Sequence, residues 1–177
     1  MVLKIALGIL LGGVLLMVGC GALVAAGSSS LDTTSAGGKA EKSAVKTGVV
    51  GQKVTNAGTS YRVTDVKTTD RIGDSTFGEK AAGTFVVVGL ELTNNKNETK
   101  TFMDNNAKIV TKDGSKYESS TDASIHLDDN LMLEDIQPDL TTKGQIGFDV
   151  PQSKLAGSKL VVEDLWGNGE VKVDLGL

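Results

Sequence analysis

Cysteine, histidine and aromatic residues are all scarce in this chain of 177 residues. A single cysteine, Cys20, excludes an intramolecular disulfide and a thiolate cluster for zinc or iron–sulfur binding. The single histidine, His126, has no G-x-S-x-G nucleophile elbow to serve as a base. With only seven aromatic residues (one Trp, two Tyr and four Phe), we expect a largely aliphatic core.

Phosphate-binding loops and an excess of basic residues are also missing. Neither GxxxxGK[ST] nor GxGxxG follows a predicted strand, which argues against nucleotide chemistry. Lys and Arg number 18 against 22 Asp and Glu; beyond residue 27, where Lys4 is no longer counted, the balance is 17 − 22 = −5. This balance excludes the basic footprint of a nucleic-acid-binding protein. We therefore expect no catalytic residues, no cofactor and no enzymatic activity.

What the chain does have is one long apolar run at residues 5–26, which holds no charged residue. As a helix it would be roughly 33 Å long, enough to span the hydrocarbon core of a bilayer. Lys4 precedes the run, so the positive-inside bias keeps the amino end in the cytoplasm and places the rest of the chain outside. One reading of residues 1–27 is therefore an N-terminal apolar helix that anchors the chain in the membrane.

The same segment also fits a lipoprotein signal, with residues 5–18 as its apolar region and Met17-Val18-Gly19-Cys20 as a partial lipobox. In that case Cys20 is lipidated and becomes the first residue. Met and Val stand where a lipobox usually has Leu and then Ala or Ser, and a cleaved, secreted form is a third alternative. All three readings deliver residues 28–177 to the extracytoplasmic side, so the alternatives stay open.

Residues 28–47 are small, polar and of mixed charge, which is typical of a flexible tether. From Gly48 to Leu177 the pattern changes to short β-type runs separated by turn residues. The strongest run, residues 84–93, has apolar residues on both faces and predicts a central strand. The fold class that we expect for 48–177 is all-β, an immunoglobulin-like antiparallel sandwich of seven or eight strands.

Other runs predict the remaining strands and their turns. Residues 51–55 and 59–68 predict a hairpin around Asn56-Ala57-Gly58, and Asp113-Gly114 predicts a two-residue turn between 107–112 and 115–119. Further strands are expected at three places, ranges 141–150, 159–163 and 170–175.

Four segments together resemble a widespread, uncharacterised family of Gram-positive cell-envelope proteins: GTFVVVGLELTNNKNETKTF (83–102), KDGSKYES (112–119), IQPDLTTKGQIGFDVP (136–151) and KLVVED (159–164). The resemblance implies an anchored or lipidated amino end, a tether and an immunoglobulin-like β-sandwich similar to a mycobacterial secreted immunoprotective antigen. It implies no catalytic residue. Where that family has Pro-Gly, this chain has Pro138-Asp139, so the turn there is expected to differ.

Residues 117–142 hold seven acidic residues and no Lys or Arg. Such a segment is either a solvated crossing between sheets or a hard-cation site, and Asp128 and Asp129 are the candidate metal ligands. The apolar residues of the segment are expected to cover the open end of the sandwich: Ile125, Leu127, Leu131, Leu133 and Ile136.

From these observations we expect a non-enzymatic, extracytoplasmic module that is tethered to the cell membrane through residues 5–26 and binds an envelope protein or another macromolecule. Two alternatives are a lipoprotein that binds Ca²⁺ or a small ligand and a phage-exclusion surface lipoprotein. The identity of the partner is not encoded in any motif of the chain.

Overall fold

A computed structural model describes residues 44–167 and 169–177. The predicted apolar helix at residues 5–26 and the predicted lipid attachment site, Cys20, lie outside the described residues. No helix in the described part is long and apolar enough to cross a bilayer. The helices described there are single turns of three or four residues: η1 (Asp104–Asn106), α1 (Thr121–Ser124) and η2 (Gln152–Lys154).

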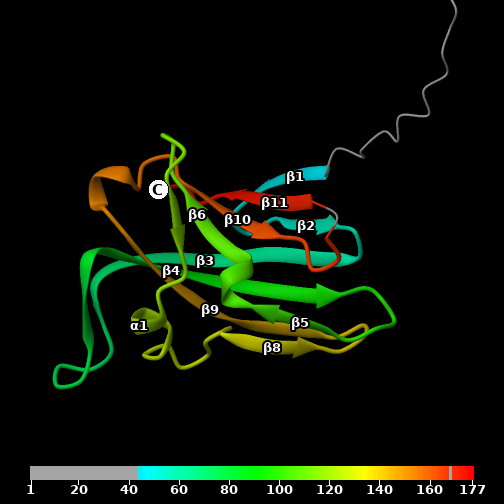
Figure 1. The fold of residues 1–177 in the computed structure, drawn as a ribbon, viewed down its shortest axis with the longest axis horizontal. Coiled ribbons are helices and arrows are strands. Elements are labelled where there is room, and N and C mark those ends of the chain that lie inside the picture. Colours follow the sequence, from blue (N-terminus) through cyan, green and yellow to red (C-terminus); the bar gives the residue numbers. More distant parts are fainter. Residues whose placement is uncertain (1–43, 168) are drawn as a thin grey trace, which may run out of the picture. The chain divides into compact units, whose positions relative to one another are not determined.

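Two main sheets pack face to face, and a small third sheet lies beside the second (Figure 1). The first sheet has the spatial order β1 (Ala44–Val49), β11 (Gly169–Asp174), β10 (Lys159–Glu163), β6 (Ala107–Val110) and β7 (Lys116–Glu118). The second has the order β2 (Lys53–Asn56), β3 (Thr59–Ile72), β4 (Glu79–Asn94) and β9 (Thr141–Val150). The third pairs β5 (Lys100–Met103) with β8 (Leu133–Ile136).

The all-β class and the sandwich agree with the sequence prediction, but the strand count and the purely antiparallel pairing do not. Within residues 44–167 and 169–177 there are eleven strands, and β1 pairs with β11 in parallel. β5 and β8 have four residues each and one exposed face. The alternation of apolar and polar residues in them is too short to predict a strand.

The first strand begins before the domain boundary that composition predicts. Residues 44–47 were assigned to the tether because they are small and polar, yet they form the first part of β1. Their pairing with β11, Val45 opposite Glu170 for example, supplies the backbone hydrogen bonds that make them a strand. The boundary between tether and domain therefore lies at or before Ala44.

The main core lies between the two large sheets and is aliphatic, as predicted. Its aromatic members are Tyr61, Phe102 and Phe148, each with an exposed fraction of 0%. β4 is a central strand with two buried faces, again as predicted. One face enters the main core through its aliphatic residues, Val86, Val88, Leu90 and Leu92.

The other face of β4 is covered by the crossing that contains α1. Phe85 and Val87 pack there with Ile72 and Ala123 in a second, smaller cluster. α1 approaches β9 closely because Gly147 has no side chain, and a Cβ at that position would lie 2.5 Å from the Cβ of Ala123. A single glycine thus allows the crossing to pack on the outside of the sheet.

The acidic segment, residues 117–142, covers the edge of β9 rather than the open end of the sandwich. Backbone hydrogen bonds join Ser120 N to Gly147 O (2.8 Å) and Leu131 N to Gln145 O (3.0 Å). Leu131 and Ile136 are buried in the main core, whereas Ile125 and Leu133 are 58% and 65% exposed. The prediction that all five apolar residues cover the core is therefore only partly correct.

The two predicted turns differ in their outcomes. β2 and β3 form the expected hairpin, but Asn56 belongs to β2 and pairs with Thr59, so the turn has two residues and not three. Ala57 and Gly58 are both at positive φ (45° and 109°), as in a type I′ turn. The loop between β6 and β7 is longer than predicted. Thr111 N donates to Ser115 O, and only Gly114 takes a positive φ, because the Asp113 carboxylate accepts from Ser115 N and holds an Asx turn.

Replacing Ala57 with asparagine is expected to raise the free energy of unfolding by about 0.5–1 kcal/mol, because asparagine tolerates left-handed φ better than alanine. Ala57→Val should have the opposite effect, since a β-branched side chain is strained there. Urea denaturation of the three proteins measures both changes. Lower stability in Ala57→Asn would show that the turn is not of type I′.

A polar contact joins the two main sheets inside the molecule. Tyr61 on β3 donates from its hydroxyl to Asp164 Oδ1 (3.2 Å), just beyond β10, and accepts from Leu165 N (3.4 Å). Burial raises the pKa of Tyr61 above its ordinary value of 10.0, and the negative charge of Asp164 raises it further. Tyr61 therefore stays neutral in the folded protein well into the alkaline range.

Candidate functional site

A hollow of about 470 Å³ lies on the outer face of the five-stranded sheet, over β6, β10 and β11. Val110 and Val161 contribute apolar side chains to it, and Lys112, Lys159 and Lys172 contribute ammonium groups. We call these five residues and the hollow between them the basic cleft. Pockets of this size with a few convergent polar groups are the usual location of ligand sites.

The strand register explains why these residues meet. Lys159 and Val161 are two residues apart on β10 and therefore point to the same face of the sheet. Across the ladders, Lys159 is opposite Val110 and Val161 is opposite Lys172. Val161 is only 3% exposed although it lies on the outer face, because neighbouring side chains cover it. The cleft is thus built on rigid strands around an apolar centre.

The positive charge of the basic cleft is only partly compensated. Lys172 Nζ lies 2.7 Å from Glu170 Oε1. In the described part of the chain, no carboxylate lies within 4.0 Å of the ammonium nitrogen of Lys112 or Lys159, not even Asp174, which is opposite Lys159 in the register. Two uncompensated ammonium groups therefore flank an apolar surface.

A second hollow of about 300 Å³ adjoins the cleft and shares Thr111 and Lys112 with it. Lys154 Nζ lies 2.9 Å from Asp113 Oδ2 there. The hydrogen bond from Thr111, followed by that from Lys154, holds the pKa of Asp113 well below its ordinary value, and the bond to Asp113 raises the pKa of Lys154. These two charges neutralise each other, so Lys112 remains the free cation between the hollows in this part of the described structure.

This arrangement is suited to binding an anion that also carries an apolar or ring surface. The whole chain has a formal net charge of −4, so a local group of lysines stands out against an acidic background. Anionic groups of a ligand would be attracted to Lys112 and Lys159, and its less polar part would contact Val110, which is partly exposed.

The structure does not bring Asp128 and Asp129 into a ligand cluster. Both side chains are exposed, between α1 and β8, and the backbone oxygen of Asp129 accepts a hydrogen bond from Gln145 N (2.6 Å). Across residues 44–167 and 169–177, no group of three or more His, Cys, Asp or Glu side chains is placed to hold a metal ion. The metal site at these two aspartates stays a prediction.

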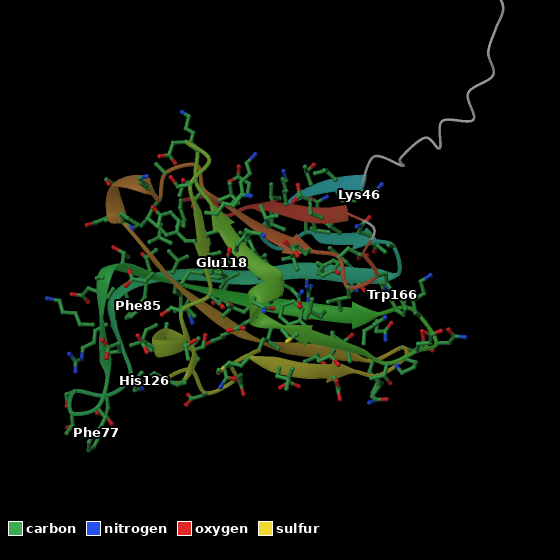
Figure 2. All side chains as sticks on the ribbon, in the orientation of Figure 1. Lys46, Phe77, Phe85, Glu118, His126 and Trp166 are labelled. Carbon is green, nitrogen blue, oxygen red and sulfur yellow. The ribbon has the colours of Figure 1, made fainter. Side chains whose placement is uncertain are left out.

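His126 lies in the same crossing, beside the turn that joins β3 to β4. Its ring packs against Gly73. In the same turn, hydrogen bonds from Phe77 N and Thr76 N hold the pKa of Asp74 below its ordinary value. Figure 2 shows His126 and Phe77 at the same end of the molecule. The histidine therefore supports a turn.

The sequence prediction missed every lysine of the basic cleft. The local pattern KLVVE (159–163) and the alternation in EVKVD (170–174) indicate that Lys159 and Lys172 point away from the core. Nothing local indicates that β10 lies between β6 and β11, which is what gathers the charges.

Comparison with known proteins places the chain in a family. A family model described as a domain of unknown function, DUF4352, matches residues 48–172. The chain belongs to the DUF4352 family. The matched range runs from β1 into β11 and includes all five residues of the basic cleft.

A relative from Bacillus subtilis and two solved structures are similar to the chain. The uncharacterised protein YxkC of Bacillus subtilis is 30% identical over 120 residues, which cover 63% of this chain and 67% of YxkC. The yjhA protein of B. subtilis has a TM-score of 0.57 at 12% identity, covering 73% of this chain and 98% of yjhA. MPT63, a secreted protein of Mycobacterium tuberculosis, has a TM-score of 0.56 at 15% identity, covering 75% and 99%.

These comparisons confirm the predicted resemblance as far as an uncharacterised β-sandwich family is concerned. At 12% and 15% identity the two structures establish a shared fold.

Proposed function

We propose that this DUF4352 protein is a non-enzymatic binding module, held outside the cytoplasm by its N-terminal segment, that binds an anionic polymer of the cell envelope through the basic cleft. The observation that carries the proposal is the pair of lysines without a carboxylate partner, Lys112 and Lys159, at a hollow that also contains the partly exposed Val110.

Location outside the cytoplasm is supported from two sides. The uncharged run at residues 5–26 fits an anchor or a lipoprotein signal, and the similar structure MPT63 is a secreted protein. An envelope polymer with phosphate or carboxylate groups is a ligand that a module on that side would meet at high local concentration. A polymer also presents many anionic groups to one open cleft, so modest affinity for each group becomes useful avidity.

The shape of the cleft favours a binding role over a catalytic one. Its polar groups are lysine ammonium groups and the hydroxyl of Thr111, and the ammonium groups are on the outer face of a sheet. Such groups attract and orient anions, and they need no proton acceptor to do so. In this proposal the sandwich holds the lysines apart at fixed spacing, and the ligand binds without being changed.

Charge reversal in the cleft tests the proposal. The full chain in neutral lipid vesicles is titrated with inorganic polyphosphate and, separately, with polyglutamate, and binding is followed by calorimetry. We expect Lys112→Glu/Lys159→Glu to weaken binding by roughly 10- to 30-fold, because attraction at two sites becomes repulsion. The remaining binding should also depend less on salt.

A matched control is Lys53→Glu/Lys67→Glu, which makes the same change in net charge on two exposed strands of the other sheet. It should bind within about threefold of the wild type, since surface charges more than a Debye length away are screened. If both double variants lose the same affinity, the effect depends only on net charge and not on the basic cleft. If the wild type binds neither polymer, the cleft is not a polyanion site.

A further inference from the structure

Trp166, the single tryptophan of the chain, lies at one end of the sandwich beneath two lysines. Lys100 Nζ is 4.3 Å and Lys96 Nζ is 5.6 Å from the centre of the indole ring. The indole nitrogen donates to Thr59 Oγ1 (3.2 Å), which fixes the ring on the start of β3. We call Trp166, Lys96 and Lys100 the indole platform.

The lysines of the platform are held in place by the loop between β4 and β5. Asn94 Oδ1 accepts from Lys96 N (2.9 Å), and Asn95 N donates to Gly58 O (2.8 Å). The side chain of Lys96 crosses the bare Cα of Gly58, where a Cβ would lie 2.3 Å from Lys96 Cε. Contacts within the chain therefore fix the backbone of Lys96 and the indole ring of Trp166.

Two ammonium groups share one ring without a carboxylate to offset them. Neither Lys96 nor Lys100 makes an ion pair with any residue that the structure describes. Both ammonium groups lie close to the same ring, so an anion bound at its edge would be attracted by both. A half-buried tryptophan beside lysines is also the combination that favours the boundary between water and lipid.

The platform lies at the end of the domain where the chain enters from its N-terminal segment. Ala44, the first described residue, is the register partner of Gly169, three residues beyond Trp166. Figure 2 shows Trp166 at the opposite end from Phe77. Leu140, 57% exposed, lies at the end of the four-stranded sheet that carries Thr59, because Thr59 is paired with Asn94, whose N donates to Leu140 O.

The length of chain before Ala44 limits how far this end can be from a membrane anchor. Residues 27–43 lie between the apolar run and β1 in the sequence. A flexible linker of that length would have a root-mean-square span of roughly 23 Å and a maximum reach of about 60 Å. An end of the domain held at that distance meets the bilayer surface at a high effective concentration.

We infer that the indole platform docks the domain on anionic lipid headgroups of the membrane to which the chain is anchored. The inference rests on the anchoring part of the proposed function and uses a different surface from the basic cleft. Phosphate groups of the lipids bind between Lys96 and Lys100, and the indole of Trp166 and the side chain of Leu140 enter the headgroup region. The basic cleft shares no residue with the indole platform, so in this inference it stays available to other ligands.

The test uses the fluorescence of Trp166 in the full chain, reconstituted in vesicles of phosphatidylcholine alone or with about 30% phosphatidylglycerol. Brominated phosphatidylcholine quenches an indole that touches lipid. We expect strong quenching in the anionic vesicles and weak quenching in the neutral ones. Lys96→Ala/Lys100→Ala should lower the docked-to-undocked ratio roughly 30-fold, at about fivefold for each lysine near an anionic surface.

Two further variants and one added ligand make the result decisive. Lys96→Arg/Lys100→Arg should keep the quenching, and Lys112→Ala/Lys159→Ala, with the same charge change in the basic cleft, should leave it unaltered. Equal quenching in neutral and anionic vesicles, or no quenching in either, would overturn the inference. It would also be overturned if inorganic polyphosphate, and not lipid, bound at Trp166. A chain that sediments with neither vesicle would overturn the anchoring proposal as well, whereas a sedimenting but unquenched chain would overturn the docking alone.

Discussion

Replacing Phe148 with alanine is expected to lower the free energy of unfolding by about 3–5 kcal/mol. Phe148 on β9 has an exposed fraction of 0%, is opposite Val86 of β4 and lies in the main core between the two sheets. In a core with three aromatic members, each ring fills a large share of the volume between the sheets. Its removal leaves a cavity that packed strands cannot close, and the loss of buried area adds to that cost.

Phe77→Ala is the matched control for this experiment. It removes the same atoms from a side chain that is 78% exposed at the turn between β3 and β4, and should alter stability by less than about 0.5 kcal/mol. Urea denaturation followed by circular dichroism measures both variants. Similar losses of unfolding free energy in the two variants would mean that the burial of Phe148 does not stabilise the core.

Replacing Tyr61 with phenylalanine is expected to lower the free energy of unfolding by about 1–3 kcal/mol at pH 7. The change removes the hydroxyl that donates to Asp164 and accepts from Leu165 N, and Asp164 is only 6% exposed. Asp164 Oδ2 keeps the hydrogen bond from Trp166 N (3.0 Å), but Oδ1 loses the tyrosine donor, and a buried oxygen that loses a donor costs more than the lost bond itself contributed. The contact also links the two main sheets, so its loss should destabilise both of them.

The difference in the free energy of unfolding between the wild type and Tyr61→Phe should become smaller as the pH rises above 10. Burial, with the charge of Asp164, raises the pKa of Tyr61 in the folded state above the unfolded value of 10.0. Above pH 10 the unfolded chain therefore loses this proton while the folded chain keeps it, so the wild type loses stability. The variant lacks this titration. Urea denaturation between pH 7 and pH 11 measures the gap, and a constant gap would contradict the assignment.

The two proposals assign separate roles to two separate surfaces, the basic cleft and the indole platform. The cleft is on the outer face of the five-stranded sheet, whereas the platform is formed by loops at the end where β1 begins. Each double variant therefore serves as a control for the other. If both proposals hold, the membrane orients the domain and the cleft captures polymer from the surrounding envelope.

Much of the β-structure follows from local pattern. Residues 141–150 and 159–163 were predicted as strands with the bounds that the structure has, and 84–93 was predicted as a central strand with two buried faces. Successive side chains of a strand point to opposite faces, so alternation within ten residues already shows which faces are buried. The aliphatic core follows from composition in the same way.

Turn chemistry was predictable only where the backbone decided it alone. Gly58 indicates the turn between β2 and β3. The loop between β6 and β7 is longer than predicted, because the side chain of Asp113 accepts a hydrogen bond from Ser115 N. At Pro138-Asp139, where the resembling family has Pro-Gly, Asp139 takes a φ of 59°. A left-handed residue at that position is thus retained without glycine, and Asp is among the residues that tolerate it.

The sequence by itself determined a β-sandwich, its aliphatic core, its acidic balance and the absence of disulfides, because each depends on composition or on neighbours along the chain. Only the tertiary structure decided which strands are adjacent. That order makes residues 44–47 a strand, sets Lys112 and Lys159 beside the same apolar surface, and brings Lys96 and Lys100 over Trp166. Each of these depends on pairing between segments tens of residues apart, which no local periodicity records.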